Sequence, residues 1–594
     1  MPAFSTRPEL IGTFGMVAST HWLASAVGMS ILERGGNAFD AAVATGFTLQ
    51  VVEPHLNGPG GEVPAILYSA AEQRVQVVCG QGVAPAAATV EAVRALGLEM
   101  IPGTGLLAPC VPGAFGGWLL LLERYGTLRL RDVLEPAIAY AERGWPVLPR
   151  IAETIGTVEA LFREHWPESA EVWLTGGVPA PGTLYRNPLL AATYARILRE
   201  AEAGGGSRGA EIESARRAWY QGFVAEAIDA FFRTAERFDV SGRRHGGFLR
   251  GSDLAAWRAT VEDGLARDYR GRWTVHKPGP WTQGPVFLQQ LALLEGFDLH
   301  AGEMAHADLV HTVTESAKLA FADREAWYGD PAFVEVPMAQ LLDAGYAAER
   351  RRLVGERASA ELRPGRPGGR PPQMPWASGM AGVEAAGIGD PTVSPMGATR
   401  GDTCHVDVAD RHGNLVACTP SGGWLQSSPA VPGLGFGMGT RAQIFNLQRG
   451  HPNVLEPGKR PRSTLSPSLA FRDGEPWMAF GTPGADQQDQ WSLNFFVVLT
   501  ASELNLQQAI DAPMWHTNHF PRSFYPHDSA PGSLVVEERL GADTIGELAS
   551  RGHQVAQAGP WTQGRLSATA RDPGRGVLLA AANPRGMQGY AIGR

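Results

Sequence analysis

The chain has 594 residues, long enough for more than one domain-sized core. Its 44% hydrophobic and 19% charged residues exclude a disordered chain and are typical of a globular protein. A net charge of −9 without a dense run of Lys and Arg argues against nucleic acid as a partner.

Features of targeting and membrane insertion are missing from the sequence. The first ten residues lack the basic start and apolar run of a signal peptide. No apolar run reaches the ~18–20 residues that a membrane span needs. Four cysteines are too few for a disulfide scaffold. We therefore expect a soluble, cytoplasmic protein with no membrane partner.

The first 70 residues predict two helices and a strand. Apolar residues recur at helical spacing over 24–34 and stop at a Gly-Gly pair, a typical helix end. Asn37 is placed to cap a second helix over 38–52. A glycine-rich turn over 57–61 then leads into a buried strand over 65–68. For these glycines, turn geometry is the favoured interpretation.

The middle of the chain, 115–360, is dominated by helical patterns, with a strand at 273–276. Along 309–321 the apolar residues mark one helix face, which leaves Glu315 and the pair Asp323-Arg324 for the outer face. From 363 to 401 the periodicity fails, and the Pro/Gly-rich composition predicts a flexible surface segment.

Strand patterns begin directly after this segment. Residues 404–410 and 415–418 alternate with a period of two around a turn and predict a β-hairpin. A second strand pair is expected at 467–471 and 477–480, followed by a helix through 491–499. Thr403 thus lies where an irregular segment meets the first strand of a sheet.

That position gives Thr403 a chemical role if the Asp402–Thr403 bond is cut. The new terminus would carry a hydroxyl nucleophile and its own base, the free α-amine. Two further residue pairs fit acyl transfer. The pair Ser463-Thr464 could hold a polar substrate group. The pair Gly484-Ala485, which precedes a helix, could offer N–H donors to an oxyanion. In isolation, each pair is more often a turn or a cap.

Other catalytic and metal motifs are missing or weak. Neither a Gly-x-Ser-x-Gly motif nor a phosphate-binding loop occurs. The spacings of His516 with His519 and of His306 with His311 do not match usual zinc sites, so we predict no metal and no cofactor. For Asp486 and Asp489 we favour helix capping.

Many of these residues belong to motifs that recur in one known family, in the same order. The motifs cover 24–53, 60–61, 83–85, 246–254, 268–271, 322–324, 329–331, 403–405, 410–414, 460–467, 481–484, 583–585 and 589–590. Through them, nearly the whole chain resembles the gamma-glutamyltranspeptidases, which are self-cleaving N-terminal-nucleophile hydrolases.

The resemblance implies an α+β fold, a four-layer αββα sandwich built by two subunits of one precursor. It implies a large subunit of residues 1–402 and a small subunit of residues 403–594, which begins with the nucleophile Thr403. Ser421 falls where the family has a second threonine that supports the nucleophile. Gly484 and Ala485 fall on the oxyanion turn, and Ala485 keeps its N–H donor in place provided that its φ is negative.

The chain departs from the family where the glutamyl head is bound. The family's arginine for the α-carboxylate aligns with Gln81, and its aspartate for the α-amine aligns with Ile444 or, by a small shift, Gln443. A nearby asparagine corresponds to Gly423. Charge-assisted contacts of this kind contribute several kcal/mol in a dry site, roughly 1.5–3 kcal/mol each. We therefore expect weak binding of glutathione-like donors.

These departures favour an amidase whose small-molecule substrate has a differently headed acyl group, such as a small carboxylated or otherwise polar amide. Gln81, Thr419, Arg441, Arg462 and the Ser463-Thr464 pair are the candidate substrate-binding residues. For Arg441 and Arg462, a surface or subunit salt bridge is an equally weighted alternative. Hydrolysis is expected to outweigh transpeptidation.

Two other interpretations stay open. One is a true γ-glutamyl hydrolase or transferase with altered anchoring, active in glutathione metabolism, which would release p-nitroaniline from a γ-glutamyl anilide. The other is an unprocessed scaffold or binding protein, which would persist at full length. A homo-oligomer stays possible, because the sequence does not fix the oligomeric state.

Overall fold

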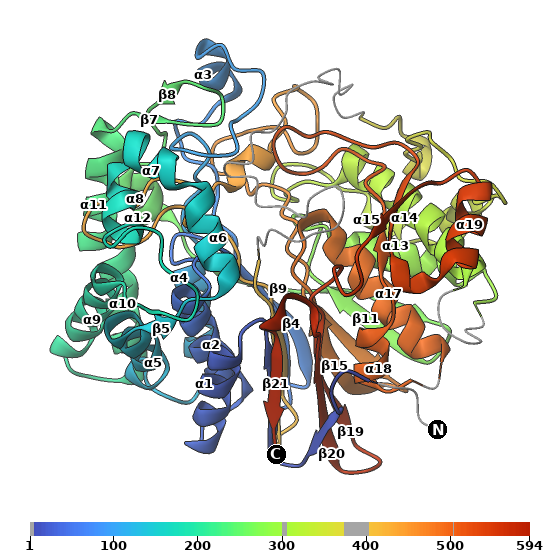
Figure 1. Ribbon diagram of the computed structural model, residues 1–594, viewed down its shortest axis with the longest axis horizontal. Coiled ribbons are helices and arrows are strands. Elements are labelled where there is room, and N and C mark those ends of the chain that lie inside the picture. Colours follow the sequence, from blue (N-terminus) through green and yellow to red (C-terminus); the bar gives the residue numbers. More distant parts are fainter. Residues whose placement is uncertain (1–4, 300–305, 374–402, 503) are drawn as a thin grey trace.

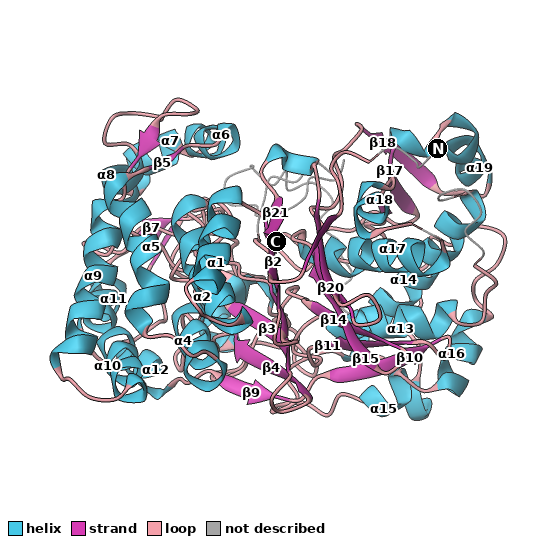
Figure 2. Ribbon diagram, turned by 90° about the horizontal axis from the view of Figure 1, so that it is seen from below, coloured by secondary structure: helices cyan, strands magenta, loops and turns pink. Residues whose placement is uncertain are grey.

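Two seven-stranded sheets lie face to face and are covered by helices on their outer sides (Figures 1 and 2). This computed structural model describes residues 5–299, 306–373, 403–502 and 504–594. The order of layers is helix, sheet, sheet, helix, so the expected αββα sandwich is confirmed. Residues 374–402, most of the predicted surface segment, lie outside the described part.

In the first sheet, strand β12 occupies an inner position between β2 and β13, with antiparallel pairing on both sides. Val406 pairs with Cys418 across the predicted hairpin, so that prediction is confirmed. All five β12 residues are buried. In spatial order the strands are β21 (Tyr590–Gly593), β2 (Gly15–Ser19), β12 (Val406–Asp410), β13 (Leu415–Cys418), β3 (Val63–Ser69), β4 (Arg74–Gly80) and β9 (Thr260–Glu262).

The second sheet is antiparallel throughout and contains the predicted second hairpin. Its strands in spatial order are β1 (Leu10–Gly12), β20 (Val577–Ala582), β19 (Ser567–Asp572), β15 (Glu475–Gly481), β14 (Ser468–Arg472), β11 (Trp273–Lys277) and β10 (Leu265–Tyr269). An apolar layer that includes Met16, Ile66, Trp281 and Leu469 fills the space between the two sheets. Each sheet therefore buries both faces, which explains the strongly apolar strands.

The outer face of the first sheet is covered by α1 and α2, with further helices packed behind them (Figure 1). Asn37 caps α2 with a full capping box, as the sequence predicts. The helices of this side are α1 (Trp22–Glu33), α2 (Ala38–Val52), α3 (Val90–Ala95), α4 (Ala114–Tyr125), α5 (Leu130–Arg143), α6 (Pro149–Thr157), α7 (Glu159–His165), α8 (Pro167–Trp173), α9 (Pro188–Ala203), α10 (Arg208–Tyr220), α11 (Phe223–Thr234) and α12 (Gly251–Ala256).

The second sheet is covered by α13, α17 and α18, with α14 packed on α13. Helices of this side are α13 (Gly284–Leu294), α14 (Ala307–Trp327), α15 (Met338–Leu341), α16 (Ala344–Arg351), α17 (Gln488–Ala501), α18 (Leu506–Asp511) and α19 (Ala542–Ser550). Strands β16 (Trp515–His516), β17 (Ser533–Glu537) and β18 (Gln554–Ala558) form a small sheet, and β5 (Trp145–Pro146) with β6 (Leu184–Tyr185) and β7 (Arg237–Phe238) with β8 (Arg244–His245) form two short ribbons.

Helix α14 corrects one sequence expectation. Glu315, Asp323 and Arg324, expected on an outer face, are all buried. Lys318 pairs with Glu315 at 2.6 Å, and Arg350 lies 3.5 Å from Asp323. Beyond Asp308 in its first turn, the helix is largely enclosed, and these buried charges are tolerated because each has a buried partner.

The glycine-rich loop at 57–61 contains the predicted turn, in which Gly61 N donates to Gly58 O at 3.0 Å. At Gly60 and Gly61, φ is not in the left-handed region, so the turn alone does not require glycine there. A Cβ at Gly61 would collide with the main-chain oxygens of Ser421 and Gly422, and one at Gly60 with that of Gly437. Glycine is required at Gly60 and Gly61 because their main chain lies directly against the main chain of 421–422 and of Gly437.

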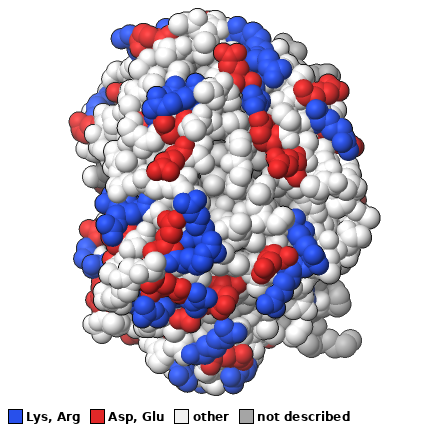
Figure 3. Space-filling model, turned by 90° about the vertical axis from the view of Figure 1, so that its left-hand side faces the viewer, with Lys and Arg blue, Asp and Glu red and all other residues white. Residues whose placement is uncertain are grey.

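Acidic and basic side chains are interspersed on the helical face that Figure 3 shows. Within the described ranges, no helix is both long and apolar enough to cross a bilayer. All four cysteines are unpaired and buried.

Candidate active site

Thr403 and Ser421 lie side by side at the entrance to the inner hairpin. Their main chains form an antiparallel bridge, and Thr403 Oγ1 lies 3.1 Å from Ser421 Oγ. Both side chains are buried. The two hydroxyls can therefore exchange a hydrogen bond in which either oxygen donates, and the sequence-predicted pair is brought together.

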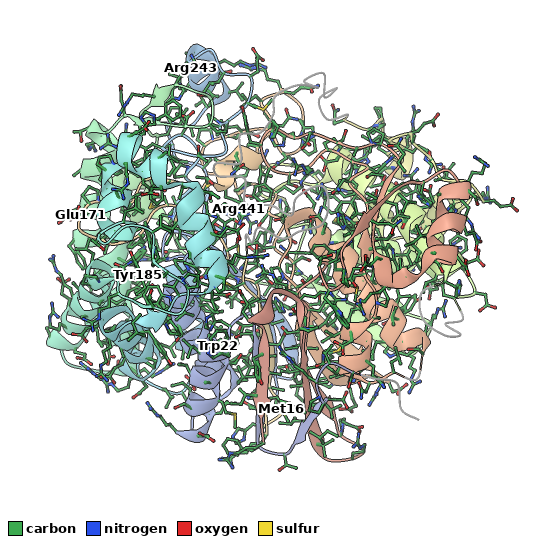
Figure 4. The ribbon with its side chains drawn as sticks, in the orientation of Figure 1. Met16, Trp22, Glu171, Tyr185, Arg243 and Arg441 are labelled. Carbon is green, nitrogen blue, oxygen red and sulfur yellow. The ribbon has the colours of Figure 1, made fainter. Side chains whose placement is uncertain are left out.

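Arg441 and Glu62 extend this contact into a chain of four side chains. Arg441 donates from Nη2 to Ser421 Oγ at 2.9 Å and from Nε to Glu62 Oε1 at 2.7 Å. Glu62 is fixed by two main-chain hydrogen bonds with Ser421, of 2.8 and 3.0 Å. Burial raises the pKa of Glu62, and Arg441 opposes that shift. Arg441 sits near the centre of the molecule, between its two helical sides (Figure 4).

The remaining surroundings of Arg441 are aromatic. Its guanidinium carbon lies 5.5 Å from the ring centre of Trp424 and 5.3 Å from that of Phe524. Trp424, Phe524, Ile444 and Ala485 form a buried apolar cluster. Nη1 of Arg441 is buried and has no hydrogen-bond partner in the described part of the chain. The guanidinium is thus held by Glu62 and Ser421, while its Nη1 makes no hydrogen bond to the described residues.

The Gly484–Ala485 turn follows β15 and begins the helical segment that continues into α17. Gly484 has φ +133°, and a Cβ there would collide with the ring of Trp491. Ala485 has φ +46°, so the expectation of a negative φ at this alanine is wrong. The left-handed conformation costs an L-residue roughly 1–2 kcal/mol, which the surrounding contacts must offset.

A buried cluster of four charges holds this turn. Arg324 pairs with Asp486, directly after Ala485, and with Glu325. Arg462 pairs with Glu325 at 2.9 Å. Arg462, with Glu325, and Arg441, with Glu62, are therefore both engaged in a salt bridge of the kind that we considered as the alternative to substrate binding. The ion pair of Arg462 with Glu325 therefore joins a segment before residue 402 to one after it.

The capping role favoured for Asp486 and Asp489 is wrong. Asp486 accepts hydrogen bonds from Arg324 and from the main chain and hydroxyl of Ser523. Asp489 is paired with Lys277 Nζ at 2.8 Å, and both side chains are completely buried. Each aspartate therefore bonds to residues of other elements and does not cap its own helix.

The other predicted substrate residues differ in availability. Thr464 Oγ1 is buried and has no partner among the described residues, whereas Ser463 Oγ accepts a weak hydrogen bond from Leu465 N. Gln81 lines a cavity of about 650 Å³ together with Arg460 and Glu262. Thr403, Ser421 and Arg441 are not among the described residues that line that cavity, although the pairing of Val63 with Gly80 places Gln81 beside Glu62, the partner of Arg441.

Thr419 belongs to a second polar chain. Its Oγ1 lies 3.0 Å from His405 Nδ1, and His405 Nε2 lies 2.9 Å from Asp407 Oδ1. Ser567 donates to the other carboxylate oxygen of Asp407 at 2.6 Å. The Thr419 hydroxyl thus supports His405, which does not favour the predicted contact with substrate.

Sequence reasoning missed Glu62, Trp424, Phe524 and Arg565. Glu62 had a signal, since it directly follows the Gly60-Gly61 pair. The two aromatic rings and Arg565 gave none, because their contacts join segments far apart in the chain. Arg565 donates from Nη2 to the main-chain oxygen of Thr403 at 3.4 Å.

The described residues contain no group of three or more His, Cys, Asp or Glu side chains arranged to hold a metal ion. The histidines of the two pairs have other partners. His516 Nδ1 lies 2.8 Å from Gln563 Oε1, and His519 Nε2 lies 3.0 Å from the oxygen of Glu361. His311 contacts His553 at 2.8 Å.

Comparison with known proteins gives a consistent result. The family model described as gamma-glutamyltranspeptidase matches residues 24–593. An acylase ACY 1 proenzyme of Pseudomonas sp. (strain V22) is 33% identical over 96% of this chain and 92% of its own. Relatives named glutathione hydrolase proenzyme, from Bacillus subtilis, and oxamate amidohydrolase proenzyme, from Klebsiella pneumoniae, are 28% and 29% identical over 98% of this chain.

Among the solved structures that resemble the whole chain are the following two. The structure of LmbA2991HD is 55% identical, covers all of both chains and has a TM-score of 0.92. The cephalosporin acylase from Bacillus halodurans is 30% identical, with coverage of 100% of this chain and 98% of its own, and a TM-score of 0.83.

Proposed function

Because the chain belongs to the gamma-glutamyltranspeptidase family and is an enzyme that acts on amide bonds, we propose that Thr403 is its nucleophile, exposed by self-cleavage. The contact of Thr403 Oγ1 with Ser421 Oγ carries this proposal. Residues 1–402 and 403–594 would form the large and small subunits. The proenzyme names of the relatives support a cleaved precursor. Cytoplasmic location stays a prediction.

Self-cleavage would begin with attack of Thr403 Oγ on the carbonyl carbon of Asp402. An ester forms at Oγ as the peptide C–N bond breaks, and the hydroxyl proton passes to the new α-amine. Water then hydrolyses the ester, which leaves a carboxylate on Asp402 and restores the hydroxyl of Thr403.

In turnover, the α-amine of Thr403 takes the hydroxyl proton as Oγ attacks the substrate carbonyl. The proton then passes to the leaving amine as the amide C–N bond breaks, and water releases the acyl group as an acid. Main-chain N–H groups at Gly484 and Ala485 would stabilise the oxyanion, with Ala485 held in the left-handed conformation that glycine adopts readily instead of the negative φ expected from the sequence. Ser421, oriented by Arg441, would hold the hydroxyl in place between turnovers.

The acyl group we propose carries a carboxylate and no ammonium group. Arg441 offers Nη1 beside the aromatic rings of Trp424 and Phe524, and Ile444 provides no charge for an amine. A buried guanidinium with a free N–H face is suited to a carboxylate. Thr464 Oγ1, which also has no partner in the described part of the chain, is a second group for polar substrate atoms.

Replacement of Thr403 by Ala tests the nucleophile. The variant should remain a single chain on a denaturing gel, whereas the wild type gives two fragments and a new N-terminus at Thr403 by intact mass. Thr403→Ser, which keeps a hydroxyl, should still be cleaved. Two fragments from Thr403→Ala would contradict the proposal.

Three 4-nitroanilides test the acyl group: glutaryl, pentanoyl and γ-glutamyl. They share a five-carbon acyl chain and differ in its carboxylate and ammonium group. We expect kcat/KM for the glutaryl anilide to exceed the other two by tenfold or more. In Arg441→Met, the ratio of glutaryl to pentanoyl should fall towards one. A γ-glutamyl preference would instead favour the activity named in the glutathione hydrolase relatives.

A further inference from the structure

Arg565 is an incompletely paired cation beside the proposed nucleophile. Its Nη2 donates to the main-chain oxygen of Thr403 at 3.4 Å. Its Nε and Nη1 are buried and have no hydrogen-bond partner among the residues that the structure describes. Arg565 thus reaches Thr403 through the main chain, whereas Arg441 reaches its side chain through Ser421.

Two histidines, one at the start of α1 and one just after α2, add ring nitrogens that have no partner among the described residues. His21 caps α1 by accepting a hydrogen bond from Leu23 N at its Nδ1. Burial lowers the pKa of His21 to about 3, so the ring is neutral and its proton is on Nε2. That N–H donor is buried and has no partner within the described ranges.

His55, which follows α2, is completely buried, and neither of its ring nitrogens has a described partner. Burial lowers its pKa well below the ordinary value, and the charges of Arg150 and Arg565 lower it further. Hydrogen bonds link the neighbours of these side chains. Thr20, next to His21, and Cys404, next to Thr403, both donate to Glu53, which lies two residues before His55, and Arg565 donates to Thr403 O. Arg150 belongs to α6, on the side of the molecule opposite the second sheet (Figure 1).

Glu53, a buried acid of this region, already accepts hydrogen bonds from three side chains. It accepts hydrogen bonds from Thr20 Oγ1 at 2.5 Å and Cys404 Sγ at 2.9 Å, and a third from Gln588. Burial raises the pKa of Glu53, and Arg565 opposes that shift. Positive charge and N–H donors therefore exceed the acceptors that the described side chains supply.

Buried donors without partners are rare in folded proteins, and each one costs roughly 1–3 kcal/mol. Several of them around a buried arginine form a site that an anion would complete. Two nitrogens of Arg565 and the Nε2 of His21 offer N–H groups there, and neutral His55 can donate from one ring nitrogen. A carboxylate, which accepts several hydrogen bonds at once, matches this set.

We propose that Arg565, His55 and His21 form a subsite for a carboxylate on the amine portion of the substrate, the part released after attack by Thr403. This inference rests on the proposed function. The acyl group would then lie on the Arg441 side of Thr403 and the amine portion on the Arg565 side. The enzyme would select amides with an anion on each side of the scissile bond.

A matched pair of glutaryl anilides tests the subsite. The 4-nitroanilide has a neutral leaving group, and the 3-carboxy-4-nitroanilide adds one carboxylate to the same ring. In the wild type, kcat/KM should be about tenfold higher for the carboxylated substrate. Arg565→Gln and, separately, His55→Phe should each reduce this ratio at least fivefold. The ratio of the two kcat/KM values within one variant is unaffected by a loss of activity that applies equally to both substrates.

Arg131→Gln serves as the control, because Arg131 lies in an exposed ion pair with Glu202. It should leave both rates and their ratio unchanged. A wild-type ratio of one or less, or a ratio that neither Arg565→Gln nor His55→Phe alters, would overturn the subsite.

Binding of the free amine keeps the test independent of turnover. By calorimetry, 5-amino-2-nitrobenzoate should bind the wild-type protein at least tenfold more tightly than 4-nitroaniline, and Arg565→Gln should abolish the difference. If Thr403 is not the nucleophile, this result still holds. Equal binding of the two amines would contradict the subsite even if the enzyme is active.

Discussion

Arg441 donates a 2.9 Å hydrogen bond to Ser421 Oγ, and that same oxygen lies 3.1 Å from Thr403 Oγ1. The guanidinium of Arg441 thus contacts the Ser421 hydroxyl, which in turn contacts the proposed nucleophile Thr403. Ser421 therefore transmits the position of Arg441 to the threonine.

Ser421→Ala should slow both self-cleavage and turnover by about 10- to 100-fold, because a hydrogen bond to a charged group contributes roughly 1.5–3 kcal/mol. Ser421→Thr, which keeps the hydroxyl, should stay within a few-fold of the wild type. Timed denaturing gels of freshly made precursor and kcat for an anilide measure the two rates. Equal rates in the Ala variant would show that Thr403 needs no support from Ser421.

Gly484 and Ala485 should respond differently to a change of one methyl group. Gly484→Ala places a Cβ against Trp491 at φ +133° and should lower the free energy of unfolding by about 2 kcal/mol or more. Ala485→Gly relieves the left-handed strain but loses a buried methyl worth about 0.8 kcal/mol, so the net change should be below about 1 kcal/mol. Urea unfolding of both variants checks this order, and a larger loss in Ala485→Gly would contradict it.

The charge cluster behind the oxyanion turn should make stability depend on acid pH. Although burial opposes the shift, Arg324 lowers the pKa of Asp486 below its ordinary value. A lowered pKa means that the stabilisation is complete above the unfolded value, about 3.9, and is lost as the pH falls through the folded value. Asp486→Asn should therefore lose about 2 kcal/mol at pH 7 and less near pH 3.

Denaturant midpoints of the wild type and Asp486→Asn at the two pH values measure this difference. Asp528→Asn is a suitable control, since Asp528 is half exposed in its pair with Arg522. A gap between Asp486→Asn and the wild type that is the same at both pH values would contradict the assignment.

Lys277 and Asp489 form a completely buried ion pair between β11 and α17. Loss of one partner leaves a buried charge alone, so Lys277→Met should cost about 3–5 kcal/mol. The double variant Lys277→Met with Asp489→Leu removes both charges and should recover most of that loss. Thermal unfolding of the single and double variants measures the recovery. A double variant as unstable as Lys277→Met would show that the pair itself stabilises the fold.

Local features of the fold could be predicted from the sequence. The helix over 38–52 and the hairpin around 411–414 depend on caps, turns and periodicity within about 15 residues, and both are confirmed. The buried charges of α14 were misplaced because their partners come from other elements. From sequence alone, a charged residue is predicted to be exposed unless its partner, distant in the chain, is known.

The candidate site shows the same division. The sequence indicated Thr403, Ser421 and Arg441, but the partner of Arg441 is Glu62, 379 residues away in the chain. The left-handed Ala485 was also unpredictable, because an alanine gives no local signal for a positive φ. Contacts between distant segments, and a conformation imposed by packing, are not written in any short stretch of sequence.

The strand order has a consequence for the two products of cleavage. In the first sheet, β12 lies between β2, from the first part of the chain, and β13, which in turn pairs with β3 of the first part. The second sheet likewise joins β14 to β11 and β20 to β1. Cutting before Thr403 would leave two polypeptides interwoven through both sheets. They should co-migrate at any dilution and melt together, so the mature enzyme would have two chains but a single unit of folding.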